Sequence, residues 1–388
     1  MYKKFYQEFL KGHAPFTHFA SHSHHFWPDI SLEGQIEAWK MASLKSDQKW
    51  GKILTETLPA VQKLIAKNLN FSRPSDIAFA SNTHELLTRL ISSLDFQSKI
   101  KVLSTKSEFH SFSRQLKRYQ ELPQFEVTLL DNEAPSFTED LIQKLEQEKF
   151  DLIFLSHVFF NSGKILELEK IKKSLKQIDP KKSLMVIDGY HAFCAIPVDI
   201  KELENHIFYI AGGYKYAQAG EGVCFMTLPQ DCQLRPLNTG WFAHFDSLEE
   251  EQTQKVLYSS DGMRFWGSTM DPSAFFRFKK VWEFFTNEGL SVEKIHLYIQ
   301  SLQKQLITAH PDLFLETDLT KLGHFLTIEF PDSEVCRKSY QVLETAKILC
   351  DFRGNRLRIG FGLYQSQEDL EQLSQAISEA KLINFLKK

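Results

Sequence analysis

The sequence lacks the cysteine patterns of a disulfide-stabilised or zinc-binding protein. Its 388 residues contain five cysteines, an odd number, and no two of them are spaced as Cys-x-x-Cys. A disulfide framework and a zinc ribbon are therefore not expected. His22, His24 and His25 cluster near the start of the chain, but no carboxylate or cysteine accompanies them at a typical ligand spacing, so we expect no metal site.

The sequence also lacks an excess of one charge and any long apolar run. Its formal net charge is -3, whereas nucleic-acid-binding proteins are usually clearly basic. No uninterrupted apolar stretch is long enough to cross a bilayer, and the first residues lack the apolar core of a signal peptide. We therefore expect no nucleic-acid or membrane partner, and a cytoplasmic location. No G-x-G-x-x-G motif follows the first strand-like run, which argues against an NAD enzyme.

The sequence does have enough apolar residues for a large core. Hydrophobic residues make up 43% of the chain, and its length favours two domains. From about residue 75, short apolar runs alternate with helical patterns, which predicts βαβ units and a mostly parallel sheet covered on both faces. The predicted strands are Ile100–Ser104, Phe125–Leu130, Asp151–Ser156, Leu184–Asp188, Ile207–Ala211 and Gly222–Thr227.

The regions on either side of these strands have a helical pattern. Residues 32–49 and 53–69 carry apolar residues at intervals of three and four. Long helical patterns at 272–288 and 291–308 precede a predicted strand at 324–330. The expected organisation is an N-terminal helical segment (1–70) that is part of the small domain, a large cofactor-binding α/β domain (71–270) and a C-terminal small α+β domain (271–388).

Three groups of polar residues follow predicted strands, at the edge where a parallel α/β sheet binds its ligands. Asp188 ends one strand and His191 follows it; this acid can reach a ligand or can simply cap the next helix. Lys215 lies past another strand in a glycine-rich segment, where it can form an imine or be an ordinary surface lysine. Asn82 and Thr83 stand where a helix begins, as an anion site or as a plain N-cap.

Together the three groups fit pyridoxal 5′-phosphate (PLP). This cofactor needs an anion site for its phosphate, a carboxylate that keeps its pyridine nitrogen protonated and a lysine that forms a Schiff base with it. The sequence supplies these in the order Asn82 and Thr83, Asp188 and Lys215. We therefore predict a PLP enzyme with Lys215, Asp188 and His191 as its catalytic residues.

These motifs resemble those of kynureninase and its relatives in the class V aminotransferase group, from about Phe19 to the C-terminus. The resemblance implies PLP fold type I, an α/β fold in which helices sandwich a mostly parallel seven-stranded sheet beside a smaller α+β domain. It also implies that Phe109 stacks on the cofactor ring and that Ser156 lies near the cofactor. The other implied cofactor-binding residues are Asn82, Thr83, Asp188, His191, Tyr214 and Lys215.

The same resemblance implies a homodimer and a substrate site. Trp241, in Gly240-Trp-Phe, and Thr269, in Phe265-Trp-Gly-Ser-Thr, match elements that reach the phosphate in the neighbouring subunit. Arg358, in Leu357-Arg-Ile, matches the arginine that binds the carboxylate of the amino-acid substrate. A planar guanidinium suits a carboxylate because it can donate two parallel hydrogen bonds.

Three departures from the kynureninase pattern lead us to expect a different substrate. The amino-terminal Asn-Ser-Leu-Gly becomes His22-Ser-His24-His25, Phe112 follows the stacking loop where an aspartate is usual, and Glu221 replaces a proline after Lys215. We expect His22 and His24 to bind the substrate. We also expect Phe112 to lie at the side-chain end of the pocket, where it would weaken activity on kynurenine.

The favoured function is a kynureninase-like hydrolase or lyase that cleaves a Cβ–Cγ or related β-bond, with Lys215 as the base. A class V aminotransferase would use the same cofactor groups. A cysteine desulfurase or selenocysteine lyase needs a nucleophilic cysteine near the C-terminal arginine, and Cys350 has the apolar surroundings of a buried, inert thiol. A non-catalytic ligand-binding protein would not need Asp188, His191, Lys215 and Arg358 together.

Overall fold

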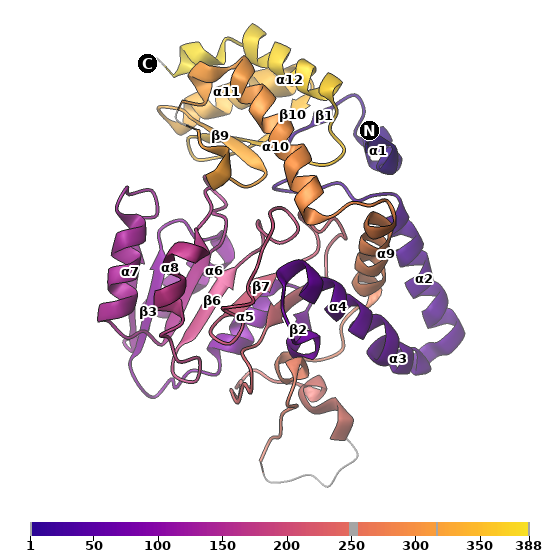
Figure 1. Ribbon diagram of the computed structural model, residues 1–388, viewed down its shortest axis with the longest axis vertical. Coiled ribbons are helices and arrows are strands. Elements are labelled where there is room, and N and C mark those ends of the chain that lie inside the picture. The colour runs from indigo at the N-terminus through magenta and orange to yellow at the C-terminus, as the bar shows by residue number, and fades with distance from the viewer. Residues whose placement is uncertain (1, 248–254, 316, 387–388) are drawn as a thin grey trace.

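The computed structural model describes residues 2–247, 255–315 and 317–386, and its larger part is built on a seven-stranded sheet (Figure 1). The strand order is β2-β8-β7-β6-β5-β3-β4. Strand β8 is antiparallel to both of its neighbours, and the remaining pairs are parallel, which confirms the mostly parallel sheet. The strands are β2 (Ile77–Ala80), β3 (Ile100–Thr105), β4 (Phe125–Leu130), β5 (Leu152–Ser156), β6 (Leu184–Asp188), β7 (Phe208–Ala211) and β8 (Cys224–Thr227).

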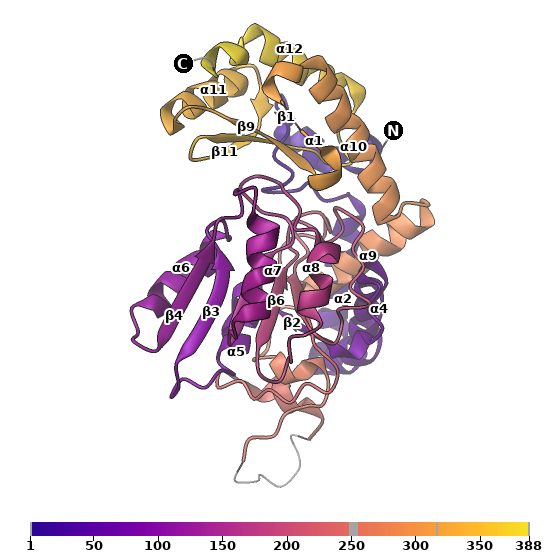
Figure 2. The same ribbon diagram turned by 60° about the vertical axis from the view of Figure 1, so that its left-hand side comes forward.

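Burial on both faces explains the continuous apolar sequences of the inner strands. Every residue of β2, β5, β7 and β8 is buried, whereas the edge strand β4 is partly exposed. Helices lie on both sides of this sheet (Figure 2). Helix α5 packs against β2, β7 and β8, and α6 packs against β4. The helices between the strands are α5 (Thr83–Ile91), α6 (His110–Gln120), α7 (Phe137–Gln147) and α8 (Leu168–Leu175).

A smaller part, drawn in orange and yellow in Figure 1, is built on a three-stranded antiparallel sheet of order β11-β12-β9. The N-terminal chain joins it, because β1 (Thr17–His18) pairs in parallel with β10 (Ile348–Leu349). Its elements are α1 (Gln7–His13), α10 (Val292–Ala309), β9 (Phe325–Glu329), α11 (Ser333–Thr345), β11 (Asp351–Arg353), β12 (Arg356–Gly360) and α12 (Gln367–Glu379).

Two long helices from opposite ends of the chain, α2 (Ile30–Lys45) and α9 (Ser273–Asn287), pack along each other beside the large sheet (Figures 1 and 2). They touch closely at Gly34, where a Cβ atom would lie 2.7 Å from the carbonyl oxygen of Phe276. A chain of short helical segments, α3 (Lys49–Lys52) and the π-helical η3 (Ile53–Thr57), leads into α4 (Leu58–Leu69). The 3-10 turns are η1 (Lys3–Phe5), η2 (Ser46–Gln48), η4 (Pro74–Asp76), η5 (Trp241–Ser247), η6 (Gly262–Phe265), η7 (Pro311–Leu313), η8 (Leu319–Lys321) and η9 (Leu382–Phe385).

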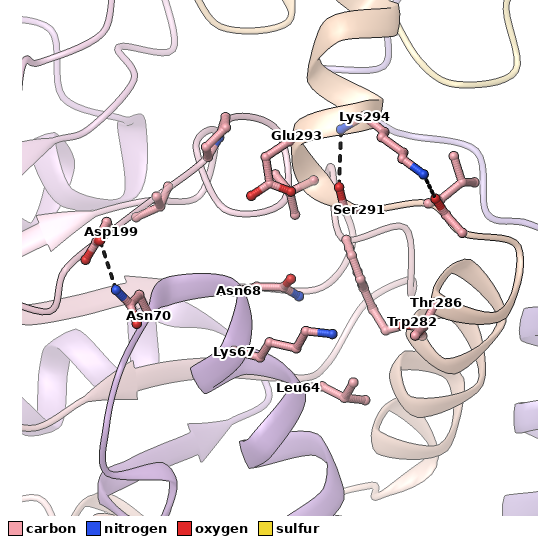
Figure 3. A pocket seen from close by; sticks show the side chains of 15 residues that line it. Leu64, Lys67, Asn68, Asn70, Asp199, Trp282, Thr286, Ser291, Glu293 and Lys294 are labelled. Atoms are coloured by element: carbon pink, nitrogen blue, oxygen red, sulfur yellow. Dashed lines mark hydrogen bonds between the residues drawn. The ribbon is translucent and has the colours of Figure 1, made fainter.

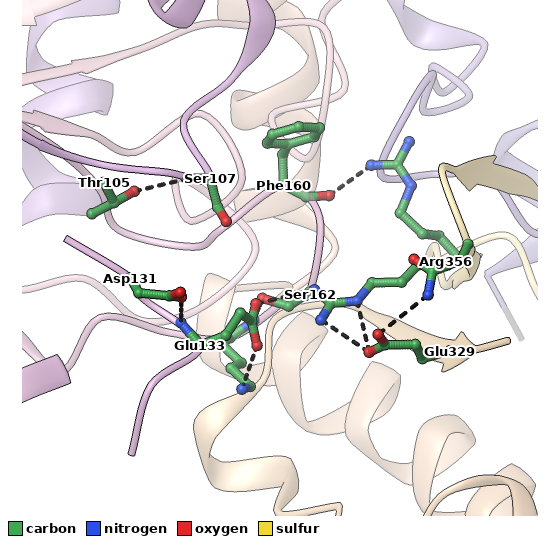
Figure 4. A network of polar contacts seen from close by, with 11 residues as sticks. Thr105, Ser107, Asp131, Glu133, Phe160, Ser162, Glu329 and Arg356 are labelled. Carbon is green, nitrogen blue, oxygen red and sulfur yellow. Dashed lines mark hydrogen bonds and ion pairs between the residues drawn. The ribbon is translucent and has the colours of Figure 1, made fainter. Parts of the chain in front are cut away.

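A polar network fixes the small sheet to the large part of the molecule (Figure 4). Arg356 on β12 lies 3.0 Å from Glu329 on β9 and 3.0 Å from Glu133, which also accepts a 2.7 Å hydrogen bond from Lys164. The guanidinium of Arg358 donates a 2.6 Å hydrogen bond to the carbonyl oxygen of Phe160 in the large part. In the part of the chain that the structure describes, no helix has the length and apolar character needed to cross a membrane.

Candidate active site

One edge of the large sheet collects the polar residues that the sequence places after strands. Strands β2, β3, β5, β6 and β7 all end at this edge, and the antiparallel β8 begins there. The loops beyond these ends surround a cavity of about 400 Å³. The predicted cofactor residues that line it are Asn82, Thr83, Phe109, Ser156, Asp188, His191, Tyr214 and Lys215.

Lys215 is the central group of this cavity. Its side chain is only 5% exposed, and its amine lies 2.7 Å from Nε2 of His191. The same amine lies over the rings of Phe109, Tyr190 and Tyr214, at 5.4, 5.1 and 5.8 Å from their centroids. Burial lowers the pKa of Lys215 far below that of an exposed lysine, and the charge of Asp188 only partly opposes this shift. The amine is therefore prepared to act as a neutral nucleophile or base.

Asp188 and His191 are two ionisable neighbours of that amine. Asp188 ends β6 beside Ser156 on β5, and its Oδ1 accepts a 2.9 Å hydrogen bond from the backbone N–H of Tyr190. Burial raises the pKa of Asp188, and the neighbouring Lys215 counteracts this. Burial, with a further contribution from Lys215, lowers the pKa of His191. The imidazole is thus neutral and can exchange a proton with the lysine amine.

Glu108 is a buried acid at this site that the sequence analysis did not single out. Its Oε2 accepts a 2.5 Å hydrogen bond from the hydroxyl of Ser156, and its Oε1 accepts one of 2.7 Å from Thr105. Burial raises the pKa of Glu108 to about 7, although both hydroxyls lower it, and Asp188 contributes to the rise. The only signal in the sequence was its place directly before the stacking residue Phe109.

The opposite end of the cavity is built on the first turn of α5. The side chain of Asn82 caps this helix by accepting a 2.9 Å hydrogen bond from the N–H of Glu85, so the residue is an N-cap and also lines the cavity. Backbone N–H groups at a helix start attract anions. Tyr214 and Cys224 line the cavity together with Asn82 and Thr83.

Arg358 and His22 lie behind the wall of the cavity and do not line it. Arg358 is buried on β12, where its guanidinium pairs with Asp351 and contacts the carbonyl of Phe160, a residue of the cavity wall. His22 is fully buried with its ring stacked on that of Phe325, and neither ring nitrogen has a hydrogen-bond partner among the described residues. The backbone oxygen of His22, not its ring, reaches the site, 3.2 Å from Nε2 of His191.

Four other expected residues also lie outside the cavity. His24 is exposed, with its ring 5.9 Å from that of Tyr214. Phe112 does not fill the side-chain end of the pocket as expected: it points from α6 into the core and stacks on Phe154 at 3.8 Å, because α6 needs an apolar residue on its inner face. Trp241 and Thr269 are exposed and do not line the cavity of their own chain.

A larger cavity, of about 590 Å³, lies between α4 and the start of α10 (Figure 3). Its labelled residues include Lys67, Asp199, Glu293 and Lys294, and the amine of Lys294 is hydrogen bonded to the carbonyl of Gly289 at 2.6 Å. Its two lysines are exposed, whereas Lys215 is buried, so the smaller cavity is the candidate active site. Among the described residues, no group of three or more histidines, cysteines or acids could hold a metal ion.

The family of the chain follows from its sequence match. The class-V aminotransferase family matches residues 32–373. The chain belongs to this family. No curated protein matches the sequence.

Several solved structures have the same fold over almost the whole length of this chain. They include the cystine C–S lyase C-DES with its reaction product cysteine persulfide (18% identity, TM-score 0.81, covering 97% of this chain and 99% of that one). A C-DES mutant with glycine covalently linked to its PLP cofactor is equally similar (18% identity, TM-score 0.81, covering 97% of this chain and 98% of that one). The cysteine desulfurase of Thermococcus onnurineus NA1 has the same fold (16% identity, TM-score 0.78, covering 95% of each chain). These matches confirm the expected fold type I architecture.

PLP is the cofactor of the class-V family, and the cavity described above fits it. A buried amine of lowered pKa, a carboxylate at the end of β6 and a helix N-terminus for the phosphate are present in one space. Phe109 lies over the amine with 38% of its surface exposed, so its ring has a free face for a planar ligand.

Glu108 should make the stability of the protein depend on pH. Its pKa is about 7 in the native state against 4.5 for an ordinary glutamate, so the native state keeps this proton to higher pH than the unfolded chain does. Stability is therefore lost as pH rises from about 4.5 to about 7, by on the order of 1–3 kcal/mol. Glu108→Gln should remove this loss in urea unfolding of the cofactor-free protein at pH 5 and 8. The exposed Glu126→Gln serves as the control, and equal pH dependence in wild type and Glu108→Gln would refute the assignment.

The open cavity mouth predicts that a second subunit completes the site. Ser81 and Asn82 at the mouth are exposed, as are Trp241 and Thr269 elsewhere on the chain. If Thr269 serves the neighbouring subunit, Thr269→Glu places a negative charge beside that subunit's phosphate and removes activity. Mixing inactive Lys215→Ala with inactive Thr269→Glu should then restore about a quarter of the sites, since half of the dimers are mixed and each has one intact site. No recovery of turnover after mixing, or an active monomer, would rule out shared sites.

Proposed function

We propose that this protein is a PLP-dependent lyase that cleaves the Cβ–S bond of a cystine- or cysteine-like amino acid and releases the sulfur fragment. The observation that carries the proposal is that, of the five cysteines, Cys224 alone lines the cavity equipped for PLP chemistry, and its thiol is buried. None of them is placed to receive sulfur from a substrate. The products would be the sulfur fragment, a 2-oxo acid and ammonium.

The cysteine nearest to Arg358 in the sequence is a poor nucleophile. Cys350 lies between β10 and β11 with 6% of its surface exposed, and burial raises its pKa far above that of a free thiol. Cys224 lines the cavity, but burial raises its pKa to about 11 and its sulfur is 3.5 Å from the hydroxyl of Tyr190. A reactive cysteine needs the opposite, an exposed thiolate of low pKa. This favours release of the sulfur over its transfer to the enzyme.

The choice of a sulfur substrate is supported by the similar structures. C-DES is a cystine C–S lyase whose product is cysteine persulfide, and the other neighbour is a cysteine desulfurase. The sulfur-cleaving alternative therefore has more support than the kynureninase-like activity that the sequence motifs favoured. Kynureninase-type hydrolysis stays the second candidate, because Tyr214-Lys215 and Gly240-Trp-Phe resemble kynureninase motifs.

The residues of the site have different roles in the proposed β-elimination. Bound PLP supplies an electron sink next to the Cα atom of the substrate. Nζ of Lys215, whose pKa burial lowers to about 7, would take the Cα proton, with Nε2 of His191 beside it at 2.7 Å. Asp188 would hold the proton on the pyridine nitrogen of bound PLP. The Cβ–S bond then breaks, and its electron pair leaves with the sulfur.

Arg358 is the cation proposed to attract the substrate carboxylate. It stands directly behind Phe160, and its pairing with Asp351 keeps the guanidinium in place while reducing its free charge. A substrate carboxylate would have to share this arginine with Asp351. Arg358 also disfavours protonation of Lys215 and His191, which supports a common electrostatic site.

The proposed activity is tested by incubating the holoenzyme with cystine, cysteine, kynurenine and alanine plus a 2-oxo acid. We expect pyruvate and a persulfide or sulfide in equal amounts from a sulfur substrate, with none from Lys215→Ala. Cys350→Ala should keep the turnover, which separates a lyase from a desulfurase that uses its own thiol. Anthranilate release from kynurenine at ordinary enzyme rates, or loss of turnover in Cys350→Ala, would contradict the proposal.

Replacing Arg358 should weaken substrate binding. A lost charge-assisted contact of this kind costs roughly 1.5–3 kcal/mol, so Arg358→Ala should raise KM about ten- to a hundredfold. The matched control is Arg353→Ala, because Arg353 contacts the same Asp351 from the solvent side at 3.1 Å. Steady-state kinetics should show a normal KM for that control. An unchanged KM in Arg358→Ala would mean that the carboxylate binds elsewhere.

A further inference from the structure

The segment that carries Lys215 has no regular structure, and only some of its carbonyl groups, such as those of Gly213 and Lys215, are bonded within it. Between the end of β7 and the start of β8 the chain makes an irregular path in which Gln218, Gly220 and Gly222 have positive φ angles. A buried carbonyl without a partner costs free energy, and a loop with free carbonyls moves. The position of the Lys215 amine therefore depends on what binds this loop.

Arg277 on α9 binds the loop at two points. Its Nε donates a 2.8 Å hydrogen bond to the carbonyl of Ala219, and its Nη2 donates one to the carbonyl of Glu221. The remaining branch of the guanidinium contacts Ser273 at 3.1 Å and also Gln35. A guanidinium is planar and rigid, so two hydrogen bonds from one side chain fix the distance between two carbonyl groups.

Helix α9 is itself held rigidly against this loop. The indole N–H of Trp282, also on α9, donates a 3.1 Å hydrogen bond to the carbonyl of Ala217. A Cβ atom on Gly222 would lie 2.5 Å from that of Ala274, so the loop and the helix are in direct contact. On the other side of α9, a Cβ atom on Gly34 of α2 would lie 2.8 Å from the Cα atom of Arg277. The arginine is thus anchored where it leaves the helix.

We propose that Arg277 is a positioning residue for the cofactor lysine: it holds the loop from Ala217 to Gly222 so that Lys215 stays in line with PLP. The inference rests on the proposal that Lys215 binds the cofactor. The residue between the two glycines is Glu221, where kynureninases carry a proline that would stiffen the backbone by itself. In this chain the Glu221 carbonyl is fixed from outside by the arginine instead.

The test compares the holoenzyme of wild type, Arg277→Gln and Lys280→Gln. Lys280 lies on the same helix, but its amine pairs with Glu37 at 3.2 Å and does not touch the loop. Release of PLP into a cofactor-free acceptor protein, followed by its visible absorbance, should be at least about tenfold faster in Arg277→Gln, because two charge-assisted hydrogen bonds to the loop are lost. Lys280→Gln should release PLP at the wild-type rate. Equal release rates in all three proteins would overturn the proposal.

A rescue separates positioning of the loop from a general loss of stability. Glu221→Pro in the Arg277→Gln background should restore slow PLP release while raising the melting temperature of the cofactor-free protein only slightly, because proline stiffens the loop backbone and adds little global stability. Arg277→Lys, which keeps the charge but not the planar pair of donors, should fall between wild type and Arg277→Gln, and it replaces Arg277→Gln if that variant does not fold. If the melting temperature and the rate of PLP release changed together in every variant, Arg277 would have only a structural role. If Lys215 did not bind PLP, borohydride would fail to reduce a cofactor onto the wild-type protein, which distinguishes failure of the underlying assignment.

Discussion

The burial of the Lys215 amine is the interaction on which the rest of the site depends. A charged amine is unstable where water cannot solvate it, so the pKa of this lysine falls to about 7 and the neutral, reactive form becomes accessible near neutral pH. Only tight enclosure achieves this, and aromatic rings of three residues, the imidazole of His191 and the backbone of His22 provide it. The positive charge of Arg358 from the small sheet acts in the same direction. Packing of the two parts of the molecule against each other is therefore part of the chemistry.

The direction of the strands decides which residues meet around that amine. Because six strands end at one edge, residues separated by tens of positions, such as Asn82, Asp188 and Lys215, line the same cavity. The antiparallel β8 begins at this edge and adds Cys224, and it turns the preceding loop back across the cavity. In such a return without a helix between β7 and β8, the carbonyls of Ala217, Ala219 and Glu221 take their hydrogen bonds from Trp282 and Arg277 on α9.

The sequence predicted those features whose cause is local. Strands buried on both faces show as continuous apolar runs, and polar residues at their ends could be recognised as cofactor ligands. Helix α6 has only a short apolar pattern, because only Phe112 and Leu116 of its eleven residues are buried. Glu108 was missed because its hydrogen-bond partner Ser156 lies on β5, 48 residues further along the chain. Two further contacts could not be predicted from local sequence patterns. Arg358 pairs with Asp351 on the neighbouring strand, and Arg277 binds a loop residue 58 positions away.

Two of the departures from the kynureninase pattern are explained by packing. Phe112 fills the space between α6 and the sheet by stacking on Phe154, and the backbone of Glu221 is bound by Arg277. The side chains that line the cavity and are free to contact a substrate then include Val158, Phe160 and Ser111. These three side chains offer apolar contact and a hydroxyl to a leaving group. Such surroundings suit a polarisable sulfur fragment, which needs no strong hydrogen bond to depart, better than a carbon fragment that needs an activated water.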